Sequence, residues 1–112
     1  MGTERRQFSR SDQPFDVPYR SFGALTESWR TGKSLDISAT GLRLQTDIPV
    51  EVGEMLELEI LLPSMQAPLS VRGTVMWSKA PPSGSSECGV EFHDLTQEQQ
   101  AQIDALVRFL KP

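Results

Sequence analysis

The chain is short of the residues on which most active sites and metal centres depend. It has one cysteine, Cys88, and one histidine, His93, among 112 residues. A single cysteine excludes an internal disulfide, and neither residue has a second ligand at the spacing of a zinc site. There is no glycine-rich phosphate loop, and no serine or cysteine is placed as an activated nucleophile. The sequence therefore predicts a protein with no catalytic residues, no metal and no resident cofactor.

Long hydrophobic runs are also missing. The longest, residues 60–62, ends at Pro63 and falls far short of the ~20 apolar residues that a membrane-spanning helix needs. No apolar stretch follows the basic start of the chain, as it would in a secretory signal. Together with the unpaired cysteine, these absences predict a cytoplasmic protein that does not insert into membranes.

Positive charge is scarce overall and concentrated in one part of the chain. Lysine and arginine number 11 against 15 acidic residues, which gives a net charge of −4. Residues 1–43 hold seven basic and five acidic residues (+2), whereas residues 44–112 hold four and ten (−6). An acidic protein with two tryptophans and one tyrosine lacks the basic, aromatic groove of a general single-strand nucleic-acid binder. The local positive charge instead predicts a small anionic ligand and no nucleic acid polymer.

Apolar residues recur at period two over most of the chain and at helical spacing at its end. The alternation in residues 69–79 places Val75 and Trp77 on one face of the strand, and Pro18 indicates an edge strand or a bulge. A capping box at Thr96 and an apolar stripe after it predict a helix over residues 96–110. The predicted strands cover residues 15–22, 28–37, 42–46, 55–62, 69–79 and 89–93.

These elements predict a mainly β fold, in which a small six-stranded antiparallel β-barrel carries one C-terminal α-helix. Short strands separated by turns favour a barrel because closure removes exposed sheet edges. Residues 1–13 are polar and aperiodic, and we interpret them as a flexible basic N-terminal arm. Residues 14–112 then form a single barrel domain.

The arm contains the first of two motifs, Arg6 and Arg10 at i and i+4, with Arg5 beside them. Guanidinium groups donate in a planar fork to phosphate oxygens or to the O6 and N7 acceptors of guanine. Taken alone, such a cluster is more often a solvated basic tail.

The second motif is Asp36, Ser38 and Gly41 within the stretch DISATG. An aspartate carboxylate only accepts hydrogen bonds and so matches the paired N1–H and N2–H donors of guanine. Glycine permits a positive φ and leaves room for a ligand to approach closely. Taken alone, the stretch is more often an ordinary strand–turn–strand in which Asp36 and Ser38 bond their own backbone.

The ordered pair of motifs within this strand pattern resembles the PilZ domain family, bacterial receptors for cyclic di-GMP. The resemblance runs from about Glu4 to Leu110 and includes the strand at residues 89–92 and the final helix. It implies that Arg6 and Arg10 grip phosphates and guanine edges while Asp36, Ser38 and Gly41 hold the other side of the nucleotide. It also implies that an arginine at position 5 favours a stacked pair of nucleotides over one.

The resemblance predicts a receptor whose arm closes over cyclic di-GMP and changes the surface offered to an unidentified partner protein. The alternative is a protein–protein adaptor of the same fold that binds no nucleotide, and the chain would be a monomer or a weak homodimer. Trp77 could stack on a guanine, or it could be a core or surface aromatic; Trp29 is interpreted as packing. Three further cations near Asp36 could add phosphate contacts but are more often solvated: Arg30, Lys33 and Arg43.

Overall fold

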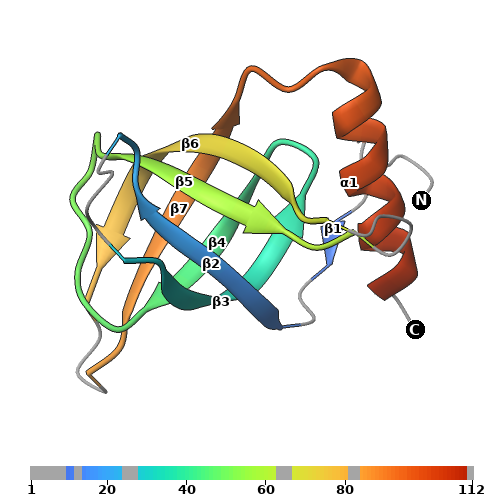
Figure 1. Ribbon diagram of the computed structural model, residues 1–112. Helices are drawn as coiled ribbons and strands as arrows, with labels where there is room; N and C mark the ends of the chain where they lie inside the picture. Colours follow the sequence, from blue (N-terminus) through green and yellow to red (C-terminus); the bar gives the residue numbers. More distant parts are fainter. Residues whose placement is uncertain (1–9, 12–13, 24–27, 63–66, 81–83, 111–112) are drawn as a thin grey trace, which may run out of the picture.

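In the part of the chain that the structure describes, seven strands and one helix follow one another (Figure 1). The structure is a computed structural model that describes residues 10–11, 14–23, 28–62, 67–80 and 84–110. The elements are β1 (Arg10–Ser11), β2 (Phe15–Ser21), β3 (Arg30–Ser38), β4 (Gly41–Thr46), β5 (Met55–Ile60), β6 (Leu69–Lys79), β7 (Ser86–His93) and α1 (Gln97–Leu110). All six predicted strands and the predicted helix are present, with small differences at their ends. β1 falls within the segment interpreted as an arm.

Six of the strands close into a barrel. The sheet runs in the order β1-β3-β2-β5-β6-β7-β4, and β3 also pairs with β4, so that β2 to β7 form an antiparallel ring. The predicted six-stranded barrel is confirmed. Strand β2 pairs with β5 only from Tyr19 onward, so Pro18 lies where β2 has β3 as its one neighbour. Proline lacks a backbone N–H, and at this position no hydrogen bond to β5 is lost.

The barrel interior is filled by the inward-facing residues of each strand. Leu56, Leu58 and Ile60 of β5 are buried, as their period-two spacing predicted. Leu44 of β4 and Val75 of β6 lie in the same core. Each such side chain contributes about 1.5–3 kcal/mol to folding when it leaves water. The outward-facing residues of the strands are consequently free to form surface sites.

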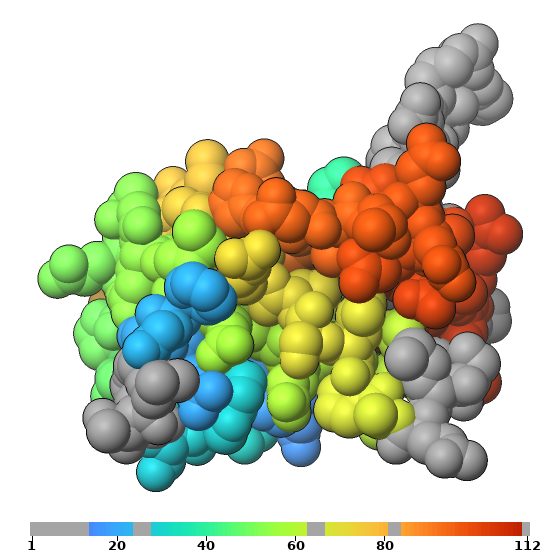
Figure 2. All heavy atoms as spheres, turned by 45° about the horizontal axis from the view of Figure 1, so that its top comes forward, coloured from blue at the N-terminus to red at the C-terminus, as the bar shows by residue number. Residues whose placement is uncertain are grey.

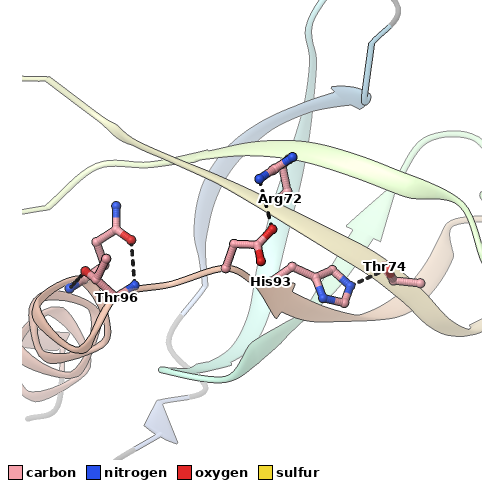
Figure 3. A network of polar contacts seen from close by, with 6 residues as sticks. Arg72, Thr74, His93 and Thr96 are labelled. Carbon is pink, nitrogen blue, oxygen red and sulfur yellow. Dashed lines mark hydrogen bonds and ion pairs between the residues drawn. The ribbon is translucent and has the colours of Figure 1, made fainter.

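Helix α1 begins with the predicted capping box (Figure 3). The Gln99 backbone N–H donates to Thr96 Oγ1 at 3.0 Å, and the Thr96 backbone N–H donates to Gln99 Oε1 at 2.9 Å. These bonds satisfy two amides that have no partner within the helix. No helix in the described ranges is long and apolar enough to span a membrane.

The apolar stripe of α1 packs over one end of the barrel, against β1 and β3. The buried stripe includes Ile103, Leu106 and Val107, as predicted, and Leu110 is partly buried. Asp104 is also buried, and its carboxylate pairs with Arg108 one turn later at 2.9 Å. The helix therefore supports the short strand β1 that carries Arg10.

Polar contacts fix the connection between the barrel and the helix (Figure 3). Arg72 of β6 donates to the Asp94 carboxylate at 3.0 Å, and Thr74 is hydrogen-bonded to His93 at the end of β7. Asp94 has a φ of 59°, a left-handed conformation that aspartate tolerates better than most residues. In Figure 2 the end of β7 and the helix form one continuous orange band along the molecule.

Candidate functional site

The two sequence motifs are brought together by the pairing of β1 with β3. Arg10 lies opposite Ser38, and Ser11 lies opposite Ile37. The last arginine of the first motif and the serine of the second are therefore neighbours across two hydrogen-bonded strands. Arg5 and Arg6 lie outside the described residues.

An irregularity in β3 determines which face of the strand carries the Asp36 side chain. Ser34 and Ile37 are both buried although they are three positions apart, which a regular strand does not allow. The pairing of β3 with β4 shifts register between Ser34 and Asp36, the signature of a β-bulge. A bulge adds one residue to a strand and re-aims the side chains that follow it. Asp36 and Ser38 are accordingly only partly buried, while Ile37 between them enters the core.

Ser38 and Gly41 flank a two-residue turn between β3 and β4. The Thr40 backbone N–H donates to Ser38 Oγ at 3.3 Å, and the two hydroxyls lie 3.1 Å apart. The Phe92 backbone N–H donates to the Thr40 carbonyl at 2.9 Å and ties the turn to β7. The local backbone bonding weighed as the alternative for Ser38 is thus present, and its hydroxyl can still make a further bond.

One of the two reasons given for Gly41, a positive φ, does not apply, because its φ is not in that range. The other, room for a ligand to approach closely, stays a prediction. In addition, a Cβ atom at this position would collide with the backbone carbonyl oxygen of Val90 on β7. Glycine is needed because β4 and β7 approach each other closely behind the turn.

Four residues form a row across the outer face of the barrel, here called the transverse row. Asp36 of β3 lies opposite Arg43 of β4, Arg43 opposite Gly89 of β7, and Gly89 opposite Trp77 of β6. Directly paired residues in antiparallel strands have Cβ positions about 4.5–5.5 Å apart. The row therefore carries a carboxylate, a guanidinium, a bare backbone and an indole side by side, next to the strand pair that holds Arg10.

Trp77 lies on this outer face, whereas regular alternation would place it on the same strand face as Val75. The pairing of β6 with β7 shifts register between Val75 and Trp77, so a second bulge reverses the alternation. The indole is 40% exposed and lies against Gly89, where a Cβ atom would overlap its Nε1, Cε2 and Cδ1 atoms. Trp77 is thus a surface aromatic on the same face as the second motif.

Arg43 of the transverse row and Lys79 next to the row share one carboxylate. Glu87 Oε1 lies 3.4 Å from Arg43 Nη1 and 3.8 Å from Lys79 Nζ. The Lys79 ammonium also lies 5.9 Å from the centroid of the Trp77 ring. Sequence reasoning weighed Arg43 as an additional phosphate contact or, more often, a solvated cation, and it did not assign Glu87 or Gly89 to the site. Strand pairing alone brings these residues together, and no local pattern signals it.

The potential metal ligands and the Cys88 thiol of the described residues do not point to a second site. They contain no group of three or more histidine, cysteine or acidic side chains that could hold a metal ion. Burial raises the pKa of the Cys88 thiol to about 11, with a smaller contribution from the Glu54 carboxylate. A thiol held protonated inside the barrel is a poor nucleophile. The outer face of β3, β4, β7 and β6 remains the candidate site, with groups suited to a planar, anionic ligand.

Comparison with protein families matches the chain to the PilZ domain over residues 4–109. No curated protein matches the chain. Among solved structures, the chain is similar to the inhibitor of motility MotI/DgrA from Bacillus subtilis, with 25% identity and a TM-score of 0.71. It is also similar in fold to YcgR from Escherichia coli in complex with c-di-GMP (13%, 0.68) and to the MrkH–c-di-GMP complex of K. pneumonia (15%, 0.67).

The matched region is nearly the whole of this chain but only part of these neighbours. The alignments cover 95%, 96% and 96% of the chain and 51%, 46% and 53% of MotI, YcgR and MrkH, respectively. The chain thus spans about half the length of each. The isolated PilZ domain of YcgR with c-di-GMP matches over 92% of its length, with 12% identity and a TM-score of 0.64.

Proposed function

The chain belongs to the PilZ domain family, and from this premise we propose that it is a receptor for cyclic di-GMP without catalytic activity. The observation that carries the proposal is the pairing of Arg10 with Ser38, which joins the two motifs at one end of the transverse row. YcgR and MrkH, which share the fold, are described in complex with this nucleotide.

The residues of the face supply the chemistry that a cyclic guanine dinucleotide requires. The Asp36 carboxylate would accept from the N1–H and N2–H groups of a guanine. The exposed Trp77 indole at the other end of the row would stack on a base, as aromatic side chains do on nucleotides. Arg6 and Arg10 would donate to the phosphates and guanine edges, and Ser38 would offer a hydroxyl.

The same geometry supports a route from ligand to partner. β1 contacts both β3 and α1, so that a ligand held by Arg10 would act on the strand against which the helix packs. We propose that nucleotide binding orders the segment at residues 1–13 over the barrel and changes the surface offered to a partner protein. Ordering a segment costs conformational entropy, which several charge-assisted bonds must offset. Arg5 would favour a stacked pair of nucleotides at this site.

Calorimetric titration of cyclic di-GMP into the wild type and into Arg10→Ala tests the proposal. Because one charge-assisted bond contributes about 1.5–3 kcal/mol, we expect Arg10→Ala to weaken binding by about tenfold or more. Arg20→Ala is the matched control, because Arg20 lies on β2 and pairs there with Glu57. It should bind as the wild type does.

The stoichiometry of the same titration separates one bound nucleotide from a stacked pair. If the wild type takes up no cyclic di-GMP, the receptor proposal is wrong. The alternative, an adaptor of the same fold that acts by protein contact alone, would then be the function to test.

A further inference from the structure

Glu87 and Arg43 form an ion pair at the edge of the proposed nucleotide face, and neither belongs to the two motifs. Arg43 stands in the transverse row between Asp36 and Gly89. Glu87 is two positions from Gly89 on the same outward face of β7, opposite Lys79 of β6. Any ligand lying along the row between Asp36 and Trp77 would therefore pass over the Arg43 side chain.

The Arg43–Glu87 pair is looser than comparable pairs on the other side of the barrel. Its closest approach is 3.4 Å, whereas Arg20–Glu57 measures 2.9 Å. Charge-assisted bonds of full strength have lengths of about 2.7–2.9 Å. The Arg43 side chain is 40% exposed against 18% for Glu87, so that the cation is the more accessible partner. An anion that forms shorter bonds with the guanidinium would therefore compete with Glu87 for it.

A second cation stays beside Glu87 when Arg43 turns to a ligand. Arg43 and Lys79 contribute two positive charges, which are balanced by Glu87 and by Asp36, the residue directly opposite Arg43 in the row. Lys79 is held more weakly still, at 3.8 Å and with 62% of its side chain exposed. A phosphate offers several acceptor oxygens and matches the planar donor fork of arginine.

We propose that Glu87 lowers the affinity of the nucleotide site because it pairs with Arg43 in the free protein. When the nucleotide binds, the Arg43 guanidinium leaves Glu87 and pairs with a phosphate. This inference rests on the proposed function. Glu87 would act as a competitor of the ligand: it keeps the guanidinium placed over the outer face in the free protein and lowers the net gain when the ligand binds. Arg43 would be a ligand-contacting residue supplied by the barrel itself.

A double-mutant cycle with calorimetric titration of cyclic di-GMP at low ionic strength tests the inference. Arg43→Met keeps the apolar stem and should weaken binding about tenfold, the value of one charge-assisted bond. Glu87→Gln frees the guanidinium and should tighten binding about threefold to tenfold. In the Arg43→Met background, the gain from Glu87→Gln should fall below about twofold, because coupled residues are not additive.

Glu57→Gln provides the control, since it removes the same charge from an arginine pair on β5, outside the proposed face. It should leave the affinity unchanged, and circular dichroism with thermal unfolding should show every variant folded. The inference is overturned if Arg43→Met binds like the wild type, if Glu87→Gln weakens binding or leaves it unchanged, or if its gain persists without Arg43. Absence of binding by the wild type itself would instead reject the proposed function.

Discussion

At the scale of single residues, two glycines shape the proposed face in different ways. Gly41 is required by the neighbouring backbone, since a Cβ atom would meet the Val90 carbonyl oxygen. Gly89 is required by a side chain, since a Cβ atom would occupy the place of the Trp77 indole. A backbone held by strand pairing on both sides cannot move aside, whereas an indole that is 40% exposed can.

Alanine should therefore affect mainly fold stability at position 41 and mainly ligand binding at position 89. Gly41→Ala should destabilise the fold by about 1–3 kcal/mol, the usual cost of overpacking. Gly89→Ala should change stability less but displace Trp77, weaken cyclic di-GMP binding and alter the tryptophan fluorescence. Urea unfolding and calorimetry on both variants check the contrast. Equal losses of stability would show that Trp77 is as firmly held as the strand backbone.

The buried Cys88 thiol should make the free energy of unfolding depend on pH in the alkaline range. The thiol is fully buried, and burial raises its pKa from 9.0 to about 11. Burial also raises the pKa of Tyr19, although Arg30 opposes this shift. Above pH 9 the unfolded chain loses the thiol proton while the folded chain keeps it, so the free energy of unfolding should fall as pH rises from about 9 to about 11.

Urea unfolding across this pH range measures the effect, with Cys88→Ala as the comparison. The variant is expected to be less stable at neutral pH because it loses core contacts, but its stability should decline less steeply above pH 9. The same slope in both proteins would mean that Cys88 ionises as readily inside the barrel as outside it.

At the scale of elements, the sequence predicts those helices and strands, and those buried faces, that are determined by residues close together along the chain. The alternation in residues 55–60 gives β5 and its buried face. The capping box at Thr96 and the spacing of Ile103, Leu106 and Val107 give α1 and the face it buries. Both are local patterns of period 2 or 3.6, and each is readable in a single segment.

The two bulges could not be predicted in this way. They change which face Asp36 and Trp77 occupy, and each exists only because a particular strand pairs with another. The transverse row likewise joins residues that are up to 53 positions apart, from Asp36 to Gly89. Sequence motifs could suggest a site around Asp36 and Ser38 with Arg43 nearby, but the neighbours Glu87 and Gly89 emerge only from the folded sheet.

The capping box of α1 gives a prediction at this scale. Thr96→Ala removes the oxygen that accepts from the Gln99 backbone N–H and should lower the free energy of unfolding by about 1 kcal/mol. Thr96→Ser keeps the hydroxyl and should restore most of the stability. Thermal and urea unfolding of the three proteins measure the difference. If serine were no better than alanine, the hydroxyl would not be the source of the stabilisation.

At the scale of the whole molecule, the barrel presents two different outer surfaces. The face of β3, β4, β7 and β6 holds the transverse row, with loosely paired cations beside an exposed indole. Across β2 and β5 the outward charges are tightly paired, as in Arg20–Glu57 at 2.9 Å. The two loosely paired cations, Arg43 and Lys79, thus lie on the face to which we assign the anionic ligand.

The central claim, that this face binds cyclic di-GMP, is tested most directly by following backbone amide and indole N–H signals in nuclear magnetic resonance spectra during titration. The account predicts that the largest shifts fall on the transverse row, the Trp77 indole and the turn at residues 38–41, while residues of β2 and β5 stay near their starting positions. Shifts centred on β2 and β5, or none at all, would contradict it.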